Sequence, residues 1–182
     1  EIPLGEGATR SYVATSIAQD ENGKLYVGTG EGFYSESEAG KKHFKTGLIG
    51  NGVYESNSFE KNWAANLQSD EEKYQYVANN ITFTQMQGTA PEKYDIMGEW
   101  SYINDMAFVG GKLFVATKNA GLKVYENGTW SSKAIAGNSM VNVTDIKVSS
   151  NGKIAVAYVY SGDAAVAIAN DANSDFSNEL TK

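Results

Sequence analysis

One short phrase occurs three times along the chain, and it constrains the fold more than any other feature. Each copy is an alternating apolar run, a residue pair containing glycine, and a second alternating run led by lysine. The pairs tolerate the positive φ angles of a type I′ turn, so each phrase predicts a β-hairpin. The hairpins and their turn pairs are residues 16–29 with Asn22-Gly23, 104–117 with Gly110-Gly111, and 144–157 with Asn151-Gly152.

A second phrase follows each hairpin. It is a glycine, a short apolar strand, a turn and an aromatic residue, and it runs from Gly50 to Trp63, from Gly121 to Trp130 and from Gly162 to Phe176. A hairpin and this phrase together make a four-stranded antiparallel meander, and stacked meanders bury each other's faces as propeller blades do. The predicted fold class is therefore all-β: consecutive four-stranded antiparallel meander blades of a partial β-propeller.

We place these blades at residues 9–68, 100–137 and 141–182 of a single partial propeller that spans 1–182. Nineteen glycines against two prolines agree with many short strands joined by tight turns. Alternation along the strands predicts the core. From the second strands it comprises Leu25, Val27, Leu113, Val115, Ile154 and Val156; from the first strands Ile17, Met106, Phe108, Ile146 and Val148; and between blades Trp63, Trp130 and Phe176.

The first unit is longer than the others, which predicts two insertions, at about 31–47 and about 69–99. Connections in a meander alternate between the two ends of the sheet. Trp63 opens the fourth strand in this scheme, so both insertions share one end, and long loops at one end of a rigid scaffold commonly carry function. The predicted contact surface comprises Glu31, Tyr34, His43, Phe44, Tyr74, Tyr76, Phe83 and Tyr94.

An alternative gives these aromatics a structural role. Residues 69–79 fit a short helix capped by Ser69, and residues 81–86 fit a small extra strand. The inserted aromatics would then only pack the insertions onto the blade ends.

The segments 25–32, 50–56 and 61–63 resemble blades of bacterial propellers with sortilin-like or Asp-box (sialidase-type) repeats. The Asp-box itself is degenerate: Ser56 and Trp63 match its first and last positions, while Ser58 and Glu60 replace its aspartate and glycine. Residues 121–130 look like the short blades of two-component-sensor propellers. The resemblance implies a bacterial protein of the cell exterior, periplasm or outer surface.

The function predicted from this resemblance is a non-catalytic binding or scaffold module that contacts a protein or glycan through the long-loop end. A propeller hydrolase or lyase with catalytic residues largely outside these blades is the alternative, and a pure sensor or assembly scaffold is a third. Three blades do not close a ring, so we expect the rest of a propeller or another chain to cover the open blade edges. The opening Glu-Ile-Pro-Leu leads us to expect a processed protein or a piece of a longer one.

Several chemistries conflict with the composition. A net charge of −7 disfavours nucleic acid, and the apolar runs are shorter than the ~20 residues of a membrane helix. There is no cysteine, and the single arginine, Arg10, cannot form the arginine triad of a sialidase. His43, the one histidine, has no triad spacing around it. We therefore predict no catalytic residues.

Calcium is the one cofactor that the sequence raises. Asp171, Asn173 and Asp175 alternate as the opening ligands of a calcium loop do, but Phe176 occupies the position of the EF-hand glycine. We predict no cofactor and keep calcium at this loop as the alternative.

Overall fold

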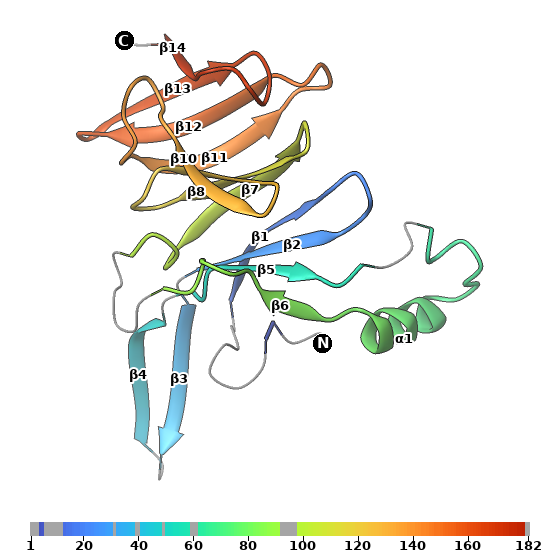
Figure 1. Ribbon diagram of the computed structural model, residues 1–182. Coiled ribbons are helices and arrows are strands. Elements are labelled where there is room, and N and C mark those ends of the chain that lie inside the picture. Colours follow the sequence, from blue (N-terminus) through green and yellow to red (C-terminus); the bar gives the residue numbers. More distant parts are fainter. Residues whose placement is uncertain are drawn as a thin grey trace.

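The computed structural model describes residues 4–5, 13–30, 32–38, 41–48, 50–58, 62–91 and 98–180, and in strands β3, β4 and most of β14 the backbone only. It is mostly β, with three four-stranded antiparallel sheets and one short helix (Figure 1). Within the described residues the sheets do not close into a barrel. The all-β prediction is confirmed.

Each sheet follows the chain order of its strands. The first sheet consists of β1 (Ala14–Gln19), β2 (Leu25–Thr29), β5 (Val53–Ser56) and β6 (Phe83–Gln85). The second consists of β7 (Ile103–Val109), β8 (Lys112–Thr117), β9 (Leu122–Glu126) and β10 (Thr129–Lys133). The third consists of β11 (Asn142–Val148), β12 (Ile154–Tyr160), β13 (Asp163–Ala169) and β14 (Ser177–Leu180). The three predicted hairpins are β1–β2, β7–β8 and β11–β12.

The turns of these hairpins are less uniform than predicted. Gly110 and Gly111 both have positive φ, as a type I′ turn requires. At the other two hairpins only Gly23 and Gly152 do, and five residues, 20–24 and 149–153, join the strands. Within each loop a four-residue turn forms, in which Gly23 donates to the carbonyl of Asp20 and Gly152 to that of Ser149. The Oδ1 atom of Asp20 accepts from the backbone N–H groups of Asn22 and Lys24, both at 2.9 Å. A side-chain acceptor there stabilises the longer loop.

The three sheets stack through their first strands, because β1 lies beside β7 and β7 lies beside β11. Each first strand carries a β-bulge at the same place: between Ala14 and Ser16, between Ile103 and Asp105, and between Val143 and Asp145. One apolar cluster fills the space between the first and second sheets and another the space between the second and third. Strand β8 is therefore buried on both faces, with Leu113 and Val115 toward the first sheet and Phe114 and Ala116 toward the third.

Most predicted core residues lie in these two clusters. Five of the six second-strand residues are buried, and Leu25 is half-buried. The prediction is wrong for Ile17 and Val148, which are 63% and 39% exposed. Ile17 points away from the second sheet, and no described element covers it as the second sheet covers the matching Ile146.

A threonine and a glycine close the second-to-third strand connection in the first two sheets. The Oγ1 of Thr117 donates to the carbonyl of Gly121 at 2.7 Å and accepts from the N–H of Ala120 at 3.0 Å. The Oγ1 of Thr29 bonds Gly52 and Asn51 in the same way, at 2.7 and 2.8 Å. The first two sheets thus share the same threonine–glycine hydrogen bonds between their second and third strands, although in the first sheet this connection contains a long insertion.

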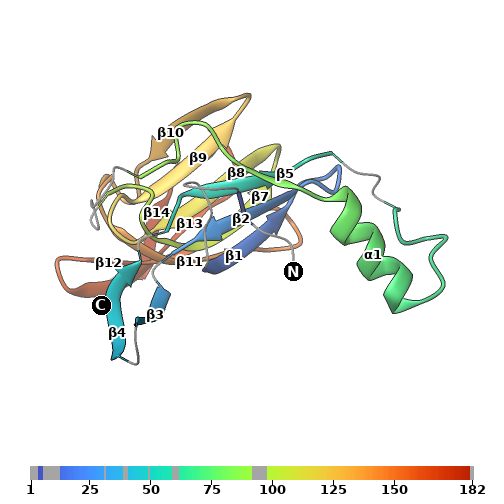
Figure 2. The same cartoon turned by 90° about the horizontal axis from the view of Figure 1, so that it is seen from below.

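The insertions project from opposite ends of the first sheet, contrary to the prediction. The first forms a hairpin of β3 (Gly32–Glu38) and β4 (Lys41–Leu48) between strands β2 and β5. The second contains α1 (Asp70–Asn80) and joins β5 to β6. Figures 1 and 2 show the hairpin and the helix pointing away from the sheet on different sides. The error arises because β6, and not a strand at Trp63, is the fourth strand.

Trp63 consequently has a different role from the one predicted. It lies in the connection before α1 and stacks on Tyr76 of the helix, with ring centroids 5.2 Å apart and planes 12° from parallel. Phe83, which opens β6, is the true counterpart of Trp130 and Phe176. The helix itself agrees with the alternative prediction, since Ser69 caps it and Glu72 completes a capping box.

Candidate functional site

The predicted contact residues do not form one surface. Tyr34, His43 and Phe44 lie on the β3–β4 hairpin, where Glu36 pairs with His43 across the strands. Tyr74 and Tyr76 lie on α1, at the other end of the sheet. Glu31 and Tyr94 lie outside the described residues, as do parts of both predicted insertions.

The residues at the helix end have separate surroundings. Tyr74 is 54% exposed, Tyr76 stacks on Trp63, and Phe83 is half-buried in the first sheet. No residue of α1 is buried, so the helix extends away from the core. Among the described residues, this end presents the exposed ring of Tyr74.

The acidic loop raised as a calcium alternative is closed by its own hydrogen bonds. Asp171 Oδ1 accepts from the N–H groups of Asn173 and Ser174, both at 2.8 Å, and these bonds hold the pKa of Asp171 below its usual value. Asp175 pairs with Lys133 at 3.2 Å. In the described part of the chain, no three acidic, histidine or cysteine side chains are grouped to hold a metal ion.

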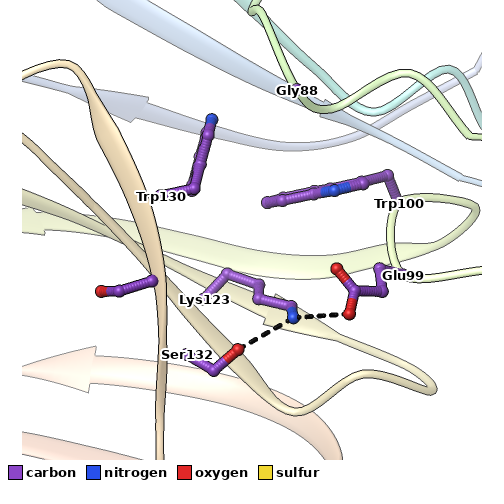
Figure 3. A pocket seen from close by; sticks show the side chains of 7 residues that line it. Gly88, Glu99, Trp100, Lys123, Trp130 and Ser132 are labelled. Atoms are coloured by element: carbon purple, nitrogen blue, oxygen red, sulfur yellow. Dashed lines mark hydrogen bonds and ion pairs between the residues drawn. The ribbon is translucent and has the colours of Figure 1, made fainter.

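The structure reveals a hollow that the sequence did not predict. It has a volume of about 340 Å³ and opens where the second sheet meets the chain segment between β6 and β7. Strands β9 and β10 form one side, and the segments after β6 and before β7 form the other (Figure 3). Its lining residues are Gly88, Glu99, Trp100, Lys123, Trp130, Ser131 and Ser132.

A buried lysine forms the polar floor of the hollow. Lys123 is only 5% exposed, and its strand neighbours Leu122 and Val124 are core residues. Its Nζ lies 3.1 Å from Glu99 Oε1 and donates to Ser132 Oγ at 3.0 Å. Because an isolated buried ammonium is costly, these partners hold the charge in place and orient it. The carboxylate of Glu99 is 56% exposed and remains open to the solvent side.

Two tryptophans form the apolar wall. The rings of Trp100 and Trp130 meet edge to face, with centroids 4.6 Å apart and planes at 63°. The ring centroid of Tyr125 lies 4.8 Å from that of Trp130, and Trp130 Nε1 donates to the carbonyl of Gln87 at 3.2 Å. Figure 3 shows both indoles above Lys123 and Glu99. The wall is thus fixed in position before any ligand arrives, which reduces the entropic cost of binding.

No sequence signal pointed to this site. Lys123 alternates with Leu122 and Val124 as the polar residue of a strand with one solvent face does, and only the packing of the second sheet buries it. Trp130 was predicted to pack between blades, and it also lines the hollow. Glu99 and Trp100 lie far from Lys123 in sequence, so only the fold brings the three together.

No protein-family model matches the sequence, and no curated protein matches it significantly. Among the residues that the structure describes, no helix is long and apolar enough to cross a membrane.

Proposed function

We propose that the chain is a non-catalytic binding module made of consecutive β-propeller blades, and that it binds a glycan in the hollow. The blade arrangement is supported by the repeated bulge, by the repeated threonine–glycine connection and by the adjacent first strands. A parallel bridge to the start of a fourth strand also occurs twice: Ile135, which follows the second sheet, bridges to Phe176 of the third. Leu4 bridges in the same way to Phe83.

The pairing of a rigid indole wall with a charged floor carries the proposal. Sugar rings expose apolar C–H faces that stack on aromatic rings, while their hydroxyl groups need both donors and acceptors. The half-buried Trp130 supplies the stacking surface, and Trp100, only 7% exposed, holds it edge to face. Glu99 supplies an acceptor, and Ser131 and Ser132 supply both donors and acceptors. A volume of about 340 Å³ fits the lower end of small-molecule sites, which are roughly 300–1,000 Å³. Following the resemblance, we place this binding outside a bacterial cell or in its envelope.

Tryptophan fluorescence gives a direct test. The chain has three tryptophans, and in a Trp63→Phe background both remaining indoles line the hollow. We expect sugars selected on a glycan array to shift the emission of this variant and to release heat in calorimetry.

Variants of the hollow should then separate binding from folding. Trp130→Ala is expected to weaken binding by roughly tenfold or more, as removal of a central aromatic contact usually does. Glu99→Gln keeps an oxygen acceptor for Lys123 but removes the charge, so it should weaken binding and also lower stability, and its thermal unfolding must be measured beside its affinity. Trp63→Ala at the helix should leave binding unchanged. The proposal is wrong if array hits bind equally well to Trp130→Ala and Glu99→Gln, or if no glycan binds.

A further inference from the structure

Four asparagine–glycine steps occur along the chain, and such a step can deamidate without an enzyme. The glycine nitrogen attacks the side-chain Cγ of the asparagine, a new C–N bond forms, and the side-chain nitrogen leaves as ammonia together with the glycine N–H proton. Water then opens the cyclic imide at either carbonyl and gives aspartate or isoaspartate, in which the main chain passes through the side-chain carbons. The four steps are Asn22-Gly23, Asn51-Gly52, Asn127-Gly128 and Asn151-Gly152.

In two of these steps the attacking nitrogen is already hydrogen-bonded. The N–H of Gly23 donates to the carbonyl of Asp20 at 3.1 Å. The N–H of Gly152 donates in the same way to the carbonyl of Ser149 at 2.9 Å. The side chain of Asn151 is held as well, because its Oδ1 accepts from Ser149 Oγ at 2.5 Å. The reaction at both steps therefore requires the turn to open first.

The step at Asn51 is enclosed by the first sheet. Gly52 is buried, and a Cβ built on it would lie 1.9 Å from the carbonyl oxygen of Thr89, so a ring has no room beside it. The backbone of Asn51 is held on both sides, because its N–H donates to Thr29 Oγ1 at 2.8 Å and its carbonyl accepts from Gln85 Nε2 at 2.6 Å. Imide formation here would need the sheet itself to open.

The remaining step, Asn127-Gly128, has none of these restraints. It is the two-residue turn between β9 and β10, and both residues are exposed and have positive φ, +49° and +82°. No atom lies within 4 Å of a Cβ built on Gly128. Within the described part of the chain, neither the N–H of Gly128 nor the side chain of Asn127 has a hydrogen-bond partner. The nitrogen and the Cγ are therefore free to rotate toward each other.

We propose that Asn127 is the site at which the folded chain deamidates, and that its isoaspartate product loosens strand β10. This strand lies at the edge of its sheet and pairs with β9 alone, with Thr129 opposite Glu126 next to the turn. A two-residue turn sets the register of the strands that it joins, and isoaspartate lengthens the main chain of this turn by one carbon atom. The inference does not rest on the proposed glycan binding, although β10 also carries Trp130 of the hollow.

Asn22 is a matched control within the same molecule, because Asn22 and Asn127 both stand in a Glu-Asn-Gly sequence. Peptide mapping by mass spectrometry follows conversion at all four sites, in the folded chain and in concentrated urea, both in mildly alkaline buffer. We expect Asn127 to react in the folded chain at nearly its rate in urea. Asn22 and Asn151 should be slowed by roughly two- to tenfold, the factors that one ordinary hydrogen bond gives, and Asn51 by more. If Asn127 reacts no faster than Asn22, each relative to its rate in urea, the proposed site is wrong.

The effect on β10 is measured on the deamidated protein, which anion exchange separates from the intact chain because it carries one more negative charge. This protein is a mixture of the two products, and Asn127→Asp supplies the aspartate product alone, with the added charge and an unchanged main chain. We expect a share of the deamidated protein equal to its isoaspartate content to exchange its β10 amide hydrogens roughly tenfold faster than Asn127→Asp. Equal exchange in the two samples would overturn the loosening of β10.

Discussion

Gly121 is the residue whose replacement should most directly report the repeated connection between second and third strands. It has a φ of +75°, and a Cβ built on it would lie 2.1 Å from the carbonyl oxygen of Ser139. Its own backbone is held on both sides, since its N–H donates to Val141 at 3.0 Å and its carbonyl accepts from Thr117. The chain at Gly121 therefore cannot move away from Ser139 without loss of hydrogen bonds.

Two costs add in Gly121→Ala. A left-handed backbone costs a residue with a Cβ about 1–2 kcal/mol, partly offset by about 0.4–1 kcal/mol from the restricted unfolded chain. Relieving the contact with Ser139 displaces backbone and weakens at least one hydrogen bond, each about 0.5–1.5 kcal/mol, with overpacking adding about 1–3 kcal/mol. We therefore expect a loss of about 2–5 kcal/mol in the free energy of unfolding.

Gly152→Ala is the matched control. Gly152 has a φ of +81°, but no atom lies within 4 Å of its built Cβ, so only the backbone cost applies. Urea unfolding followed by tryptophan fluorescence should show a loss of about 1 kcal/mol for this variant. Gly52→Ala should resemble Gly121→Ala, since its Cβ would lie 1.9 Å from the carbonyl oxygen of Thr89. Equal losses for Gly121→Ala and Gly152→Ala would refute the reasoning.

Three further predictions concern single side chains. Burial raises the pKa of Tyr26 to about 12, and the charges of Asp20 and Glu55 add to the effect. The stabilisation due to its neutral form is therefore complete below pH 10 and is lost between pH 10 and 12. The free energy of unfolding should fall less steeply with rising pH for Tyr26→Phe than for wild type. Ser69→Ala removes the cap of α1 at a cost of about 1 kcal/mol; because no helix residue is buried, faster amide exchange within the helix should reveal it, with the global midpoint unchanged. Lys123→Met should leave the midpoint of thermal unfolding unchanged or raise it, since replacing a buried ion pair by apolar contacts is often neutral or stabilising; a drop of several degrees would show that the pair stabilises the fold.

The local elements were predictable because their causes lie within a few residues. Glycine pairs between alternating runs specify hairpins, and Ser69 followed by acidic residues specifies the start of a helix. The same alternation predicted that Leu113 and Val156 are fully buried. It did not predict which of two short aromatic-led segments, at Trp63 or Phe83, completes the first sheet. Both satisfy the local pattern, and only pairing with β5 decides between them.

The sequence by itself determined an all-β chain with three repeated sheets, since turn chemistry and side-chain alternation act between neighbours along the chain. Tertiary structure alone decided the end at which each insertion emerges, the exposure of Ile17, and the meeting of Glu99, Trp100 and Lys123 in one hollow. These features depend on which sheet packs against which face. Such packing is a property of residues distant in sequence, and no local pattern encodes it.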